Sequence, residues 1–376
     1  MSEVHAARRS RLRAAGGAGA RGAAAVLVTR PANVRYLAGG VPGGAALLLG
    51  PTEEHAERED ILVCPSAPTG DPTEGRVDET LRVIVLSASG ADSAVAGADL
   101  AAASRADSLV VEEHDLSVAR YRALRSVAAR LHLADLGRTV ERHRLVKDEE
   151  EIACLRVASE IADQALGELL ESILVGRTER HLALELERRL IDHGADGAAF
   201  PISVGTGPNS GLRGHPPTDR RVEEGDFLSV RLGAGYRGYR SELGRTFVIG
   251  TSPDTWQIDL YELVFSAQRA GREALLPGAE YRVVDRAARQ RLDTAGYGGQ
   301  LPPSSGHGVG LENDEDPRLS PTAMGKLDAC VPVTVGPGVH LPGRGGVRID
   351  DTLVVRPEAD GGPELLTITT KELLAL

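Results

Sequence analysis

The chain of 376 residues has few aromatic residues, few lysines and only three cysteines. Cys64, Cys154 and Cys330 are far apart and form no CxxC or CxxH pattern, so the sequence indicates neither a disulfide framework nor a thiolate zinc site. We expect free, buried thiols. Lysine occurs only at positions 147, 326 and 371, so arginine supplies nearly all the positive charge. We interpret this bias as genome composition and not as function.

Long apolar runs are also missing. No stretch approaches the length of a membrane span, and the first 21 residues lack the unbroken apolar segment of a secretory signal. We therefore expect a cytoplasmic protein without a membrane partner. The 43 basic and 54 acidic residues give a net charge of −11 that is spread along the chain, which argues against nucleic acid as a partner.

The hydrophobic content of 41% is enough for a sizeable core, and the length suits two domains. In the first part, short apolar runs alternate with helical stretches such as 121–133, a pattern typical of a mixed α/β domain. The runs are 25–28, 45–49, 61–63, 81–86 and 108–111. We place this domain at residues 1–141. A second domain, 145–376, opens with a helix that has an acidic first turn and apolar periodicity from Ile152 to Ile173.

The second domain contains an internal repeat. A helix over 179–192 stops at Gly194, and a helix over 281–294 stops at Gly296. Each follows a longer helix and precedes a β-rich segment, 227–249 in one copy and 331–355 in the other. Two such helix-helix-strand halves predict an α/β (α+β) fold in which they pack pseudo-symmetrically around one curved antiparallel sheet. A cleft lined by both halves is the natural ligand site.

Four motifs carry a resemblance to a known family. NVRYLAG at 33–39, RLVK at 144–147, GHGVGL at 306–311 and LPGRGGVRIDD at 341–351 occur in the order and spacing of one family. The chain resembles the pita-bread-fold family of aminopeptidase P, prolidase, methionine aminopeptidase and creatinase over essentially its whole length. Its layout is most similar to that of two-domain Xaa-Pro peptidases. The resemblance implies a creatinase-like N-terminal domain, a pita-bread C-terminal domain and a homodimer.

Active members of that family hold two divalent metals with two Asp, one His and two Glu, and the metals activate a shared water. By the resemblance, these positions are Arg231, Glu242, His307, Gly336 and Asp350 in this chain. Three of the five can still ligate. His307 lies between two glycines, and a purely structural role for it stays open.

The family's acid-base histidines are replaced as well. By the same resemblance, they fall on Gly214 and Asp314. His215 is a candidate substitute, although a displacement by one residue in a strand would turn the side chain to the opposite face. His340 stands where active members usually have a Tyr beside the substrate, so it is a candidate ligand contact, with a rim position as the alternative.

The formal charges at these positions indicate whether the site could still bind a metal ion. Glu242 and Asp350 keep two of the family's four negative charges, and Arg231 adds a positive one. A dication ~4 Å from a fixed unit cation is repelled by roughly 8 kcal/mol at an effective dielectric of about 20. We predict that the cleft holds neither a metal nor another cofactor, and that Arg231 binds Glu242 and Asp350 in place of the metals. Arg348 is expected to form an ion pair with Asp351.

Three functions compete. The first is a catalytically inactive pseudo-peptidase that binds a small molecule or a peptide end in the cleft. The second is a metal-independent C–N hydrolase of the creatinase type, in which His307, Glu242 and Asp350 would transfer protons and Arg231 would hold a substrate carboxylate. The third is an Xaa-Pro peptidase with a remodelled metal site. We rank them in this order. The candidate ligand contacts are Arg231, Glu242, His307, His340, Arg348 and Asp350, and the candidate catalytic groups are His307, Glu242, Asp350 and His215.

Overall fold

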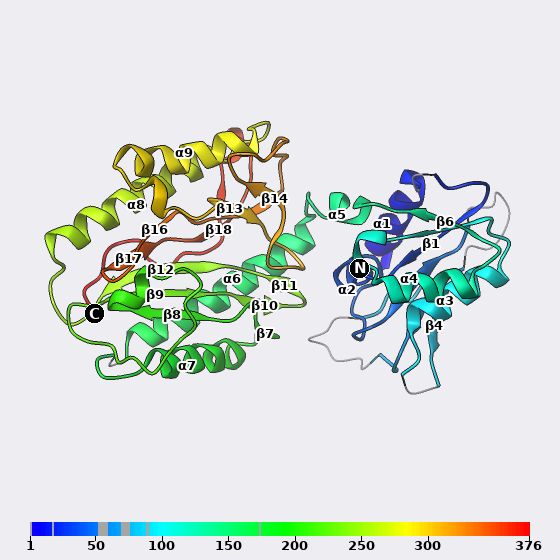
Figure 1. Ribbon diagram of the computed structural model, residues 1–376, viewed down its shortest axis with the longest axis horizontal. Helices are drawn as coiled ribbons and strands as arrows, with labels where there is room; N and C mark the ends of the chain where they lie inside the picture. Colours follow the sequence, from blue (N-terminus) through cyan, green and yellow to red (C-terminus); the bar gives the residue numbers. More distant parts are fainter. Residues whose placement is uncertain (1, 17–18, 52–58, 69–75, 88–89, 173) are drawn as a thin grey trace. The chain divides into compact units, whose positions relative to one another are not determined.

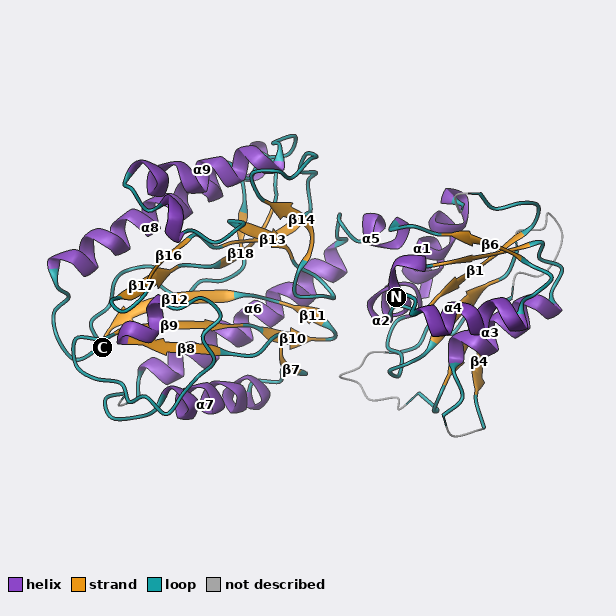
Figure 2. Cartoon of the chain, in the orientation of Figure 1, coloured by secondary structure: helices purple, strands orange, loops and turns teal. Residues whose placement is uncertain are grey.

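The computed structural model describes the chain apart from residues 1, 17–18, 52–58, 69–75, 88–89 and 173. It divides into two compact units, Met1–Arg144 and Leu145–Leu376. Both units combine helices and strands, as Figure 2 shows, and the α/β (α+β) fold prediction is confirmed. No helix among the described residues has the length and apolar character needed to cross a membrane.

The first unit is built on a six-stranded mixed sheet in the order β4-β3-β2-β1-β5-β6. Its strands are β1 Ala24–Val28, β2 Ala46–Leu49, β3 Asp60–Cys64, β4 Arg82–Val85, β5 Ser108–Val111 and β6 His132–Asp135. The five predicted apolar runs lie on β1 to β5. The helix expected over 121–133 was predicted too long, because Leu133 pairs with Leu109 in the parallel β5–β6 ladder, a contact that local periodicity does not reveal.

The helices of this unit are α1 Ser2–Ala15, α2 Pro31–Ala38, α3 Ser93–Ala103, α4 Val118–Val127 and α5 Thr139–His143. Buried alanines of α3, Ala94 among them, share a core cluster with Leu27 of β1 and Leu109 of β5. Small side chains allow the helix to lie close to the sheet. All three cysteines are free, but only Cys64 is buried, so the expectation of buried thiols is wrong for the other two.

The second unit contains both predicted halves. The first half comprises α6 Glu149–Leu170, α7 Glu179–Asp192, β7 Gly197–Ala198, β8 Ser203–Thr206, β9 Phe227–Leu232, β10 Ala234–Tyr236, β11 Tyr239–Arg240 and β12 Leu243–Val248. The second half comprises α8 Thr255–Glu273, α9 Tyr281–Thr294, β13 Gly306–Gly308, β14 Glu315–Leu319, β15 Pro332–Val335, β16 Gly338–Leu341, β17 Gly345–Arg348, β18 Asp351–Val354 and β19 Glu364–Leu365. The helices expected over 179–192 and 281–294 are confirmed at both ends. Position 173, which we expected in the first helix, lies outside the described residues.

Local signals explain where these helices begin and end. The Asp148 side chain accepts a hydrogen bond from the Glu151 backbone N–H at 3.0 Å, and Glu151 returns one to the Asp148 N–H at 3.1 Å. This capping box satisfies two donors at the start of α6. Gly194 and Gly296 have φ angles of 92° and 89°, in the left-handed region, so each ends the helix before it.

The two halves meet along their strands. In Figure 1, α7 (green) lies below the strands, α6 crosses behind those of the first half, and α8 and α9 (yellow) lie above. The sheets are β12-β9-β8 in the first half and β14-β13-β15-β18-β19 in the second, with the β16–β17 pair beside them. Gly244 and Asp350 join the halves, because each donates its backbone N–H to the other's carbonyl oxygen, at 3.1 and 3.0 Å.

Candidate functional site

Both halves of the second unit contribute side chains to the candidate site. Arg231 of β9 lies opposite Gly244 of β12 in the antiparallel ladder, and Gly244 is bridged in turn to Asp350. Glu242 directly precedes β12, and His307 is the central residue of β13. Gly244 has to be a glycine, because a Cβ at that position would overlap the carboxylate of Asp350. The backbone pairing therefore brings together residues that are more than a hundred positions apart.

Glu242 is the centre of this site. Its side chain is completely buried and contacts three groups that can carry positive charge. Arg231 Nε donates to Glu242 Oε1 at 2.7 Å, and His307 Nε2 lies 3.3 Å from Oε2. Arg348 Nη2 lies 3.5 Å from Oε1. A buried carboxylate needs such compensation to remain charged.

The pKa values of this group follow from these contacts. Burial alone would raise the pKa of Glu242, but the close contact with His307 and the charge of Arg231 outweigh it and hold that pKa well below its usual value. Burial likewise tends to lower the pKa of His307, yet Glu242 raises it above its usual value. Glu242 is therefore an anion, and the imidazolium form of His307 persists to higher pH than in an unperturbed histidine.

Asp350 is bound differently from our prediction. Arg348 Nε, and not Arg231, donates to Asp350 Oδ2. Asp350 Oδ1 accepts a hydrogen bond from no described residue, and burial raises the pKa of this carboxyl despite Arg348. The Asp350 carboxylate also fills the space beside Gly336, since a Cβ at position 336 would overlap Oδ1. The absence of a side chain at 336 therefore leaves the space that the Asp350 carboxylate fills.

The arrangement does not fit a pair of divalent metals. Among the five positions that the resemblance assigns to ligands, Arg231 is a fixed cation and Gly336 has no side chain. The oxygens of Glu242 face Arg231, His307 and Arg348. In the described part of the chain, no three His, Cys, Asp or Glu side chains come together as a metal ion requires.

His340 lies at the edge of this group, on β16. Burial and the positive charges of Arg348 and Arg213 together lower the pKa of His340 to about 4, so the ring is neutral at neutral pH. Its Nδ1 is buried without a hydrogen bond to any described residue. Arg213, which sequence reasoning missed, donates to the Leu301 carbonyl.

The expected pair of Arg348 with Asp351 is wrong. Asp351 Oδ1 instead accepts from Arg245 Nη2 at 2.8 Å, and its Oδ2 accepts from Gln268 at 2.6 Å. Strand alternation explains the difference, because adjacent residues point to opposite faces, so Asp350 faces the site and Asp351 faces away from it. Sequence reasoning gave Arg245 no role.

Phe200 is a further residue that sequence reasoning missed. The Arg231 guanidinium carbon lies 4.2 Å from the centre of the Phe200 ring, close enough for a cation–π interaction. Nothing in the local sequence around Phe200 signals this contact. Asp314, at a family histidine position, is 45% exposed and lies 3.9 Å from His307 Nδ1.

His215 is not part of the site around Glu242. Its Nε2 lies 2.8 Å from Glu179 Oε2, and Glu179 also accepts hydrogen bonds from the Thr206 N–H and the Thr218 hydroxyl. Gly214 has a φ of 64°, a left-handed turn conformation that a histidine there would find strained. His215, which we predicted as a candidate catalytic group, therefore makes a buried structural contact with Glu179 instead.

Glu179 makes stability depend on pH. Burial tends to raise the pKa of Glu179, but hydrogen bonds from His215 and Thr218 lower it to about 2 from an ordinary 4.5. Because the pKa of Glu179 is lower in the folded state than in the unfolded state, its ionised carboxylate stabilises the fold at pH values above the unfolded-state pKa. That stabilisation disappears as the pH falls toward 2. We expect Glu179→Gln to lose roughly 3 kcal/mol of unfolding free energy at pH 6, with the deficit shrinking between pH 5 and pH 2. Urea unfolding at several pH values measures this difference.

Glu187→Gln is the matched control for this prediction, because Glu187 is exposed on the same helix. Its effect should be small at every pH. A Glu179→Gln deficit that stays constant from pH 6 to pH 2 would contradict the proposed ionic role.

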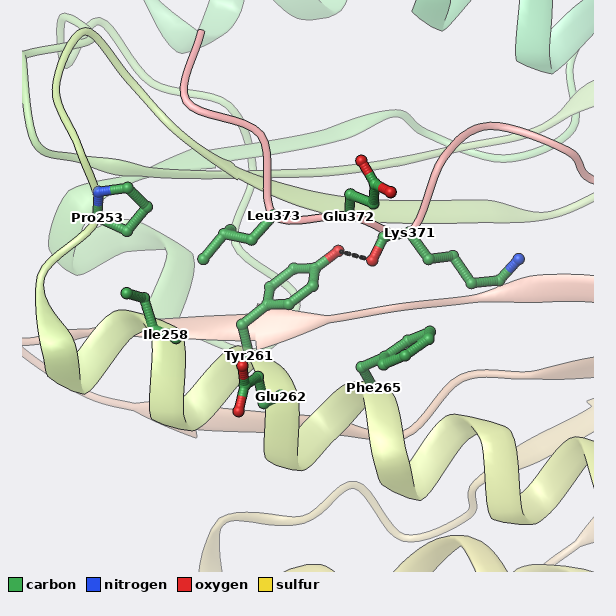
Figure 3. Close-up of a pocket in the computed structure, with 8 residues that line it drawn as sticks. All are labelled: Pro253, Ile258, Tyr261, Glu262, Phe265, Lys371, Glu372 and Leu373. Carbon is green, nitrogen blue, oxygen red and sulfur yellow. Dashed lines mark hydrogen bonds between the residues drawn. The ribbon is translucent and has the colours of Figure 1, made fainter.

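A cavity of about 570 Å³ lies elsewhere, between α8 and the C-terminal segment. Figure 3 shows Tyr261 in this cavity, and its hydroxyl donates to the Lys371 carbonyl at 3.2 Å. Pro253, Ile258, Phe265 and Leu373 supply apolar walls. None of the predicted site residues lines this cavity.

The sequence matches two protein families along its length. Residues 153–357 match metallopeptidase family M24, and residues 8–146 match the creatinase/prolidase N-terminal domain. An Xaa-Pro dipeptidase of Pyrococcus furiosus is 38% identical over 231 residues, which span 61% of this chain and 65% of that protein. An uncharacterized peptidase of Bacillus subtilis, YqhT, is 34% identical over 70% of this chain and 74% of its own length.

Solved structures show the same similarity. An Xaa-Pro dipeptidase from Bacillus anthracis superposes with a TM-score of 0.85 at 28% identity and covers 100% of this chain and 99% of its own. An X-Pro aminopeptidase from Thermotoga maritima superposes with a TM-score of 0.85 at 27% identity, covering 97% of this chain and 100% of its own. The likeness therefore extends through both units.

Proposed function

The chain belongs to metallopeptidase family M24, and from that premise we propose that it is a peptidase-like protein that works without the family's metal ions. Its relatives are named for Xaa-Pro peptides, so a peptide end or a comparably small molecule is the ligand class. In this proposal the protein binds its ligand at Arg231, His307 and Arg348, which the buried Glu242 holds in place, and does not hydrolyse it.

The contact between Arg231 Nε and Glu242 Oε1, at 2.7 Å, is the observation that supports this function. It puts a permanent cation on the carboxylate that would otherwise face a metal. Arg348 Nε likewise donates a hydrogen bond to the Asp350 carboxylate. A dication entering this site would meet two guanidinium groups at close range, and its repulsion from each would be roughly 8 kcal/mol at ~4 Å and an effective dielectric of about 20.

Metal content tests the proposal directly. The protein is dialysed against manganese or cobalt, desalted and analysed by elemental mass spectrometry, and hydrolysis of an Xaa-Pro dipeptide is measured on the same samples. We expect near-zero metal per chain and no hydrolysis above background. One or two bound ions per chain with hydrolysis would instead identify an Xaa-Pro peptidase with a remodelled site.

A second candidate is a metal-independent C–N hydrolase of the creatinase type. The 3.3 Å contact between His307 and Glu242 favours it, because Glu242 raises the pKa of His307 and so widens the pH range in which the ring can donate a proton as a general acid. Gly336, Gly214 and Asp314 count against it, since the resemblance assigns these positions to carboxylates and histidines. Hydrolysis of creatine by chelator-treated protein, abolished by His307→Gln, would place this candidate first.

A further inference from the structure

At this site the negatively charged side chains are buried and the positively charged ones are partly exposed. The side chains of Glu242 and Asp350 are completely buried, whereas those of Arg231 and Arg348 are 28% and 26% exposed. His307 lies between these extremes at 12%. The two arginines and the two carboxylates have no net charge together, but a molecule that arrives from solvent meets the arginines first. The countercharges lie beneath the guanidinium groups, out of reach of solvent.

Two nitrogen atoms of the Arg231 guanidinium group are available to donate further hydrogen bonds. Its Nε is used by Glu242, and one contact at 4.2 Å ties the guanidinium to the Phe200 ring. Neither Nη1 nor Nη2 donates a hydrogen bond within the part of the chain that the structure describes. A guanidinium held at Nε and packed on a ring keeps its orientation while its outer edge stays available.

Arg348 adds a second cation beside the first. Its Nη2 and Arg231 Nε contact the same atom, Glu242 Oε1, at 3.5 and 2.7 Å, so the two groups lie close together. Two like charges this close repel each other, and the buried carboxylates offset that repulsion only from one side. An anion on the solvent side would offset it from the other.

We infer that the solvent-facing edges of Arg231 and Arg348 bind the carboxylate group of a small organic acid or peptide end. The inference rests on the metal-free function proposed above and names its ligand class. The free Nη1 and Nη2 of Arg231 match the two oxygens of a carboxylate, which is the geometry of a bidentate pair. A cationic ligand would face both guanidinium groups without access to Glu242 or Asp350.

N-acetylglycine and N-acetylglycinamide make a matched pair of probes, because they differ only in the carboxylate. The protein is treated with chelator, desalted and titrated with each compound by isothermal titration calorimetry. We expect the acid to bind at least about tenfold more tightly than the amide, as charge-assisted hydrogen bonds predict. Equal binding of the two, or no binding of the acid, would overturn the inference.

Variants locate the binding site. Arg231→Gln should weaken acid binding at least about tenfold, and Arg231→Lys should restore only part of it, since an ammonium lacks the forked edge. Arg188→Gln, on α7 with an 82% exposed side chain, removes the same charge at a distance and should leave acid binding unchanged. Equal loss in the Arg188 and Arg231 variants would indicate a general charge effect and overturn the assignment. The acid-amide comparison on the parent protein needs no variant and stands even where Arg231→Gln fails to fold.

Metal analysis of protein that has not been treated with chelator, but dialysed against manganese or cobalt as described above, separates the carboxylate inference from the metal-free function. A metal-free protein that does not distinguish acid from amide would refute the carboxylate site and leave the metal-free function intact. Bound metal with peptide hydrolysis would refute the proposed function itself.

Discussion

Restoring the family's carboxylates should convert the chain into a protein that takes up divalent metal. The combined variant exchanges every altered ligand position and keeps His307. Its substitutions are Arg231→Asp, Glu242→Asp, Gly336→Glu and Asp350→Glu. They remove one fixed cation and provide four carboxylates, so the electrostatic balance reverses from repulsion to attraction. We expect the apparent affinity for manganese to rise at least about a thousandfold over the parent protein.

The structure explains why the four changes are needed together. A side chain at position 336 would overlap Asp350 Oδ1, so Gly336→Glu alone forces Asp350 to move within a buried site. The extra methylene of Asp350→Glu lets that carboxylate reach past its present position. Removal of Arg231 then releases the carboxylate at 242, which it binds at 2.7 Å in the parent.

Elemental mass spectrometry and manganese titration measure the outcome. The Gly336→Glu single variant is the control and should bind no more metal than the parent. Metal uptake without hydrolysis is the expected result, because Gly214 and Asp314 still lack the family's histidines. A folded combined variant that binds no metal would show that these positions were assigned wrongly.

Substituting Arg245 should cause the largest loss of stability. Its side chain is fully buried and donates to Asp351 Oδ1 at 2.8 Å and to the Asp350 carbonyl at 2.8 Å. It also binds the carbonyls of Thr369 and Thr370, so it fixes the C-terminal segment to β12. Arg245→Met would leave Asp351 buried with part of its charge uncompensated. We expect a loss of about 3–5 kcal/mol in unfolding free energy, measured by urea denaturation.

A double-mutant cycle tests the cause of that loss. Arg245→Met combined with Asp351→Asn should be less destabilised than the sum of the single variants, because the second change removes the stranded charge. Lys371 Nζ and Gln268 also contact Asp351, so some destabilisation will remain. Arg318→Met, at an arginine 54% exposed, should change stability by less than about 0.5 kcal/mol. Additive losses in the cycle would refute the ion-pair explanation.

Local patterns predicted much of the second unit. The ends of helices 179–192 and 281–294 could be read from the glycines that follow them, Gly194 and Gly296. Both signals lie within one or two turns of the helix they define. In the first unit, the helix expected over 121–133 was too long because its last residues pair with β5, and such pairing is invisible to local periodicity.

For the site, too, the sequence predicted some features and the tertiary structure decided others. At the level of sequence, the resemblance to the family assigned Arg231, Glu242, His307, Gly336 and Asp350 to one site, and the order and spacing of the motifs located these positions in the chain. Which cation binds which anion was decided by the tertiary structure. Arg348 and not Arg231 binds Asp350, and Arg245 binds Asp351. These pairings depend on strand alternation and on backbone pairing between residues about a hundred positions apart, and side-chain contacts of that kind exist only once the two halves have packed together.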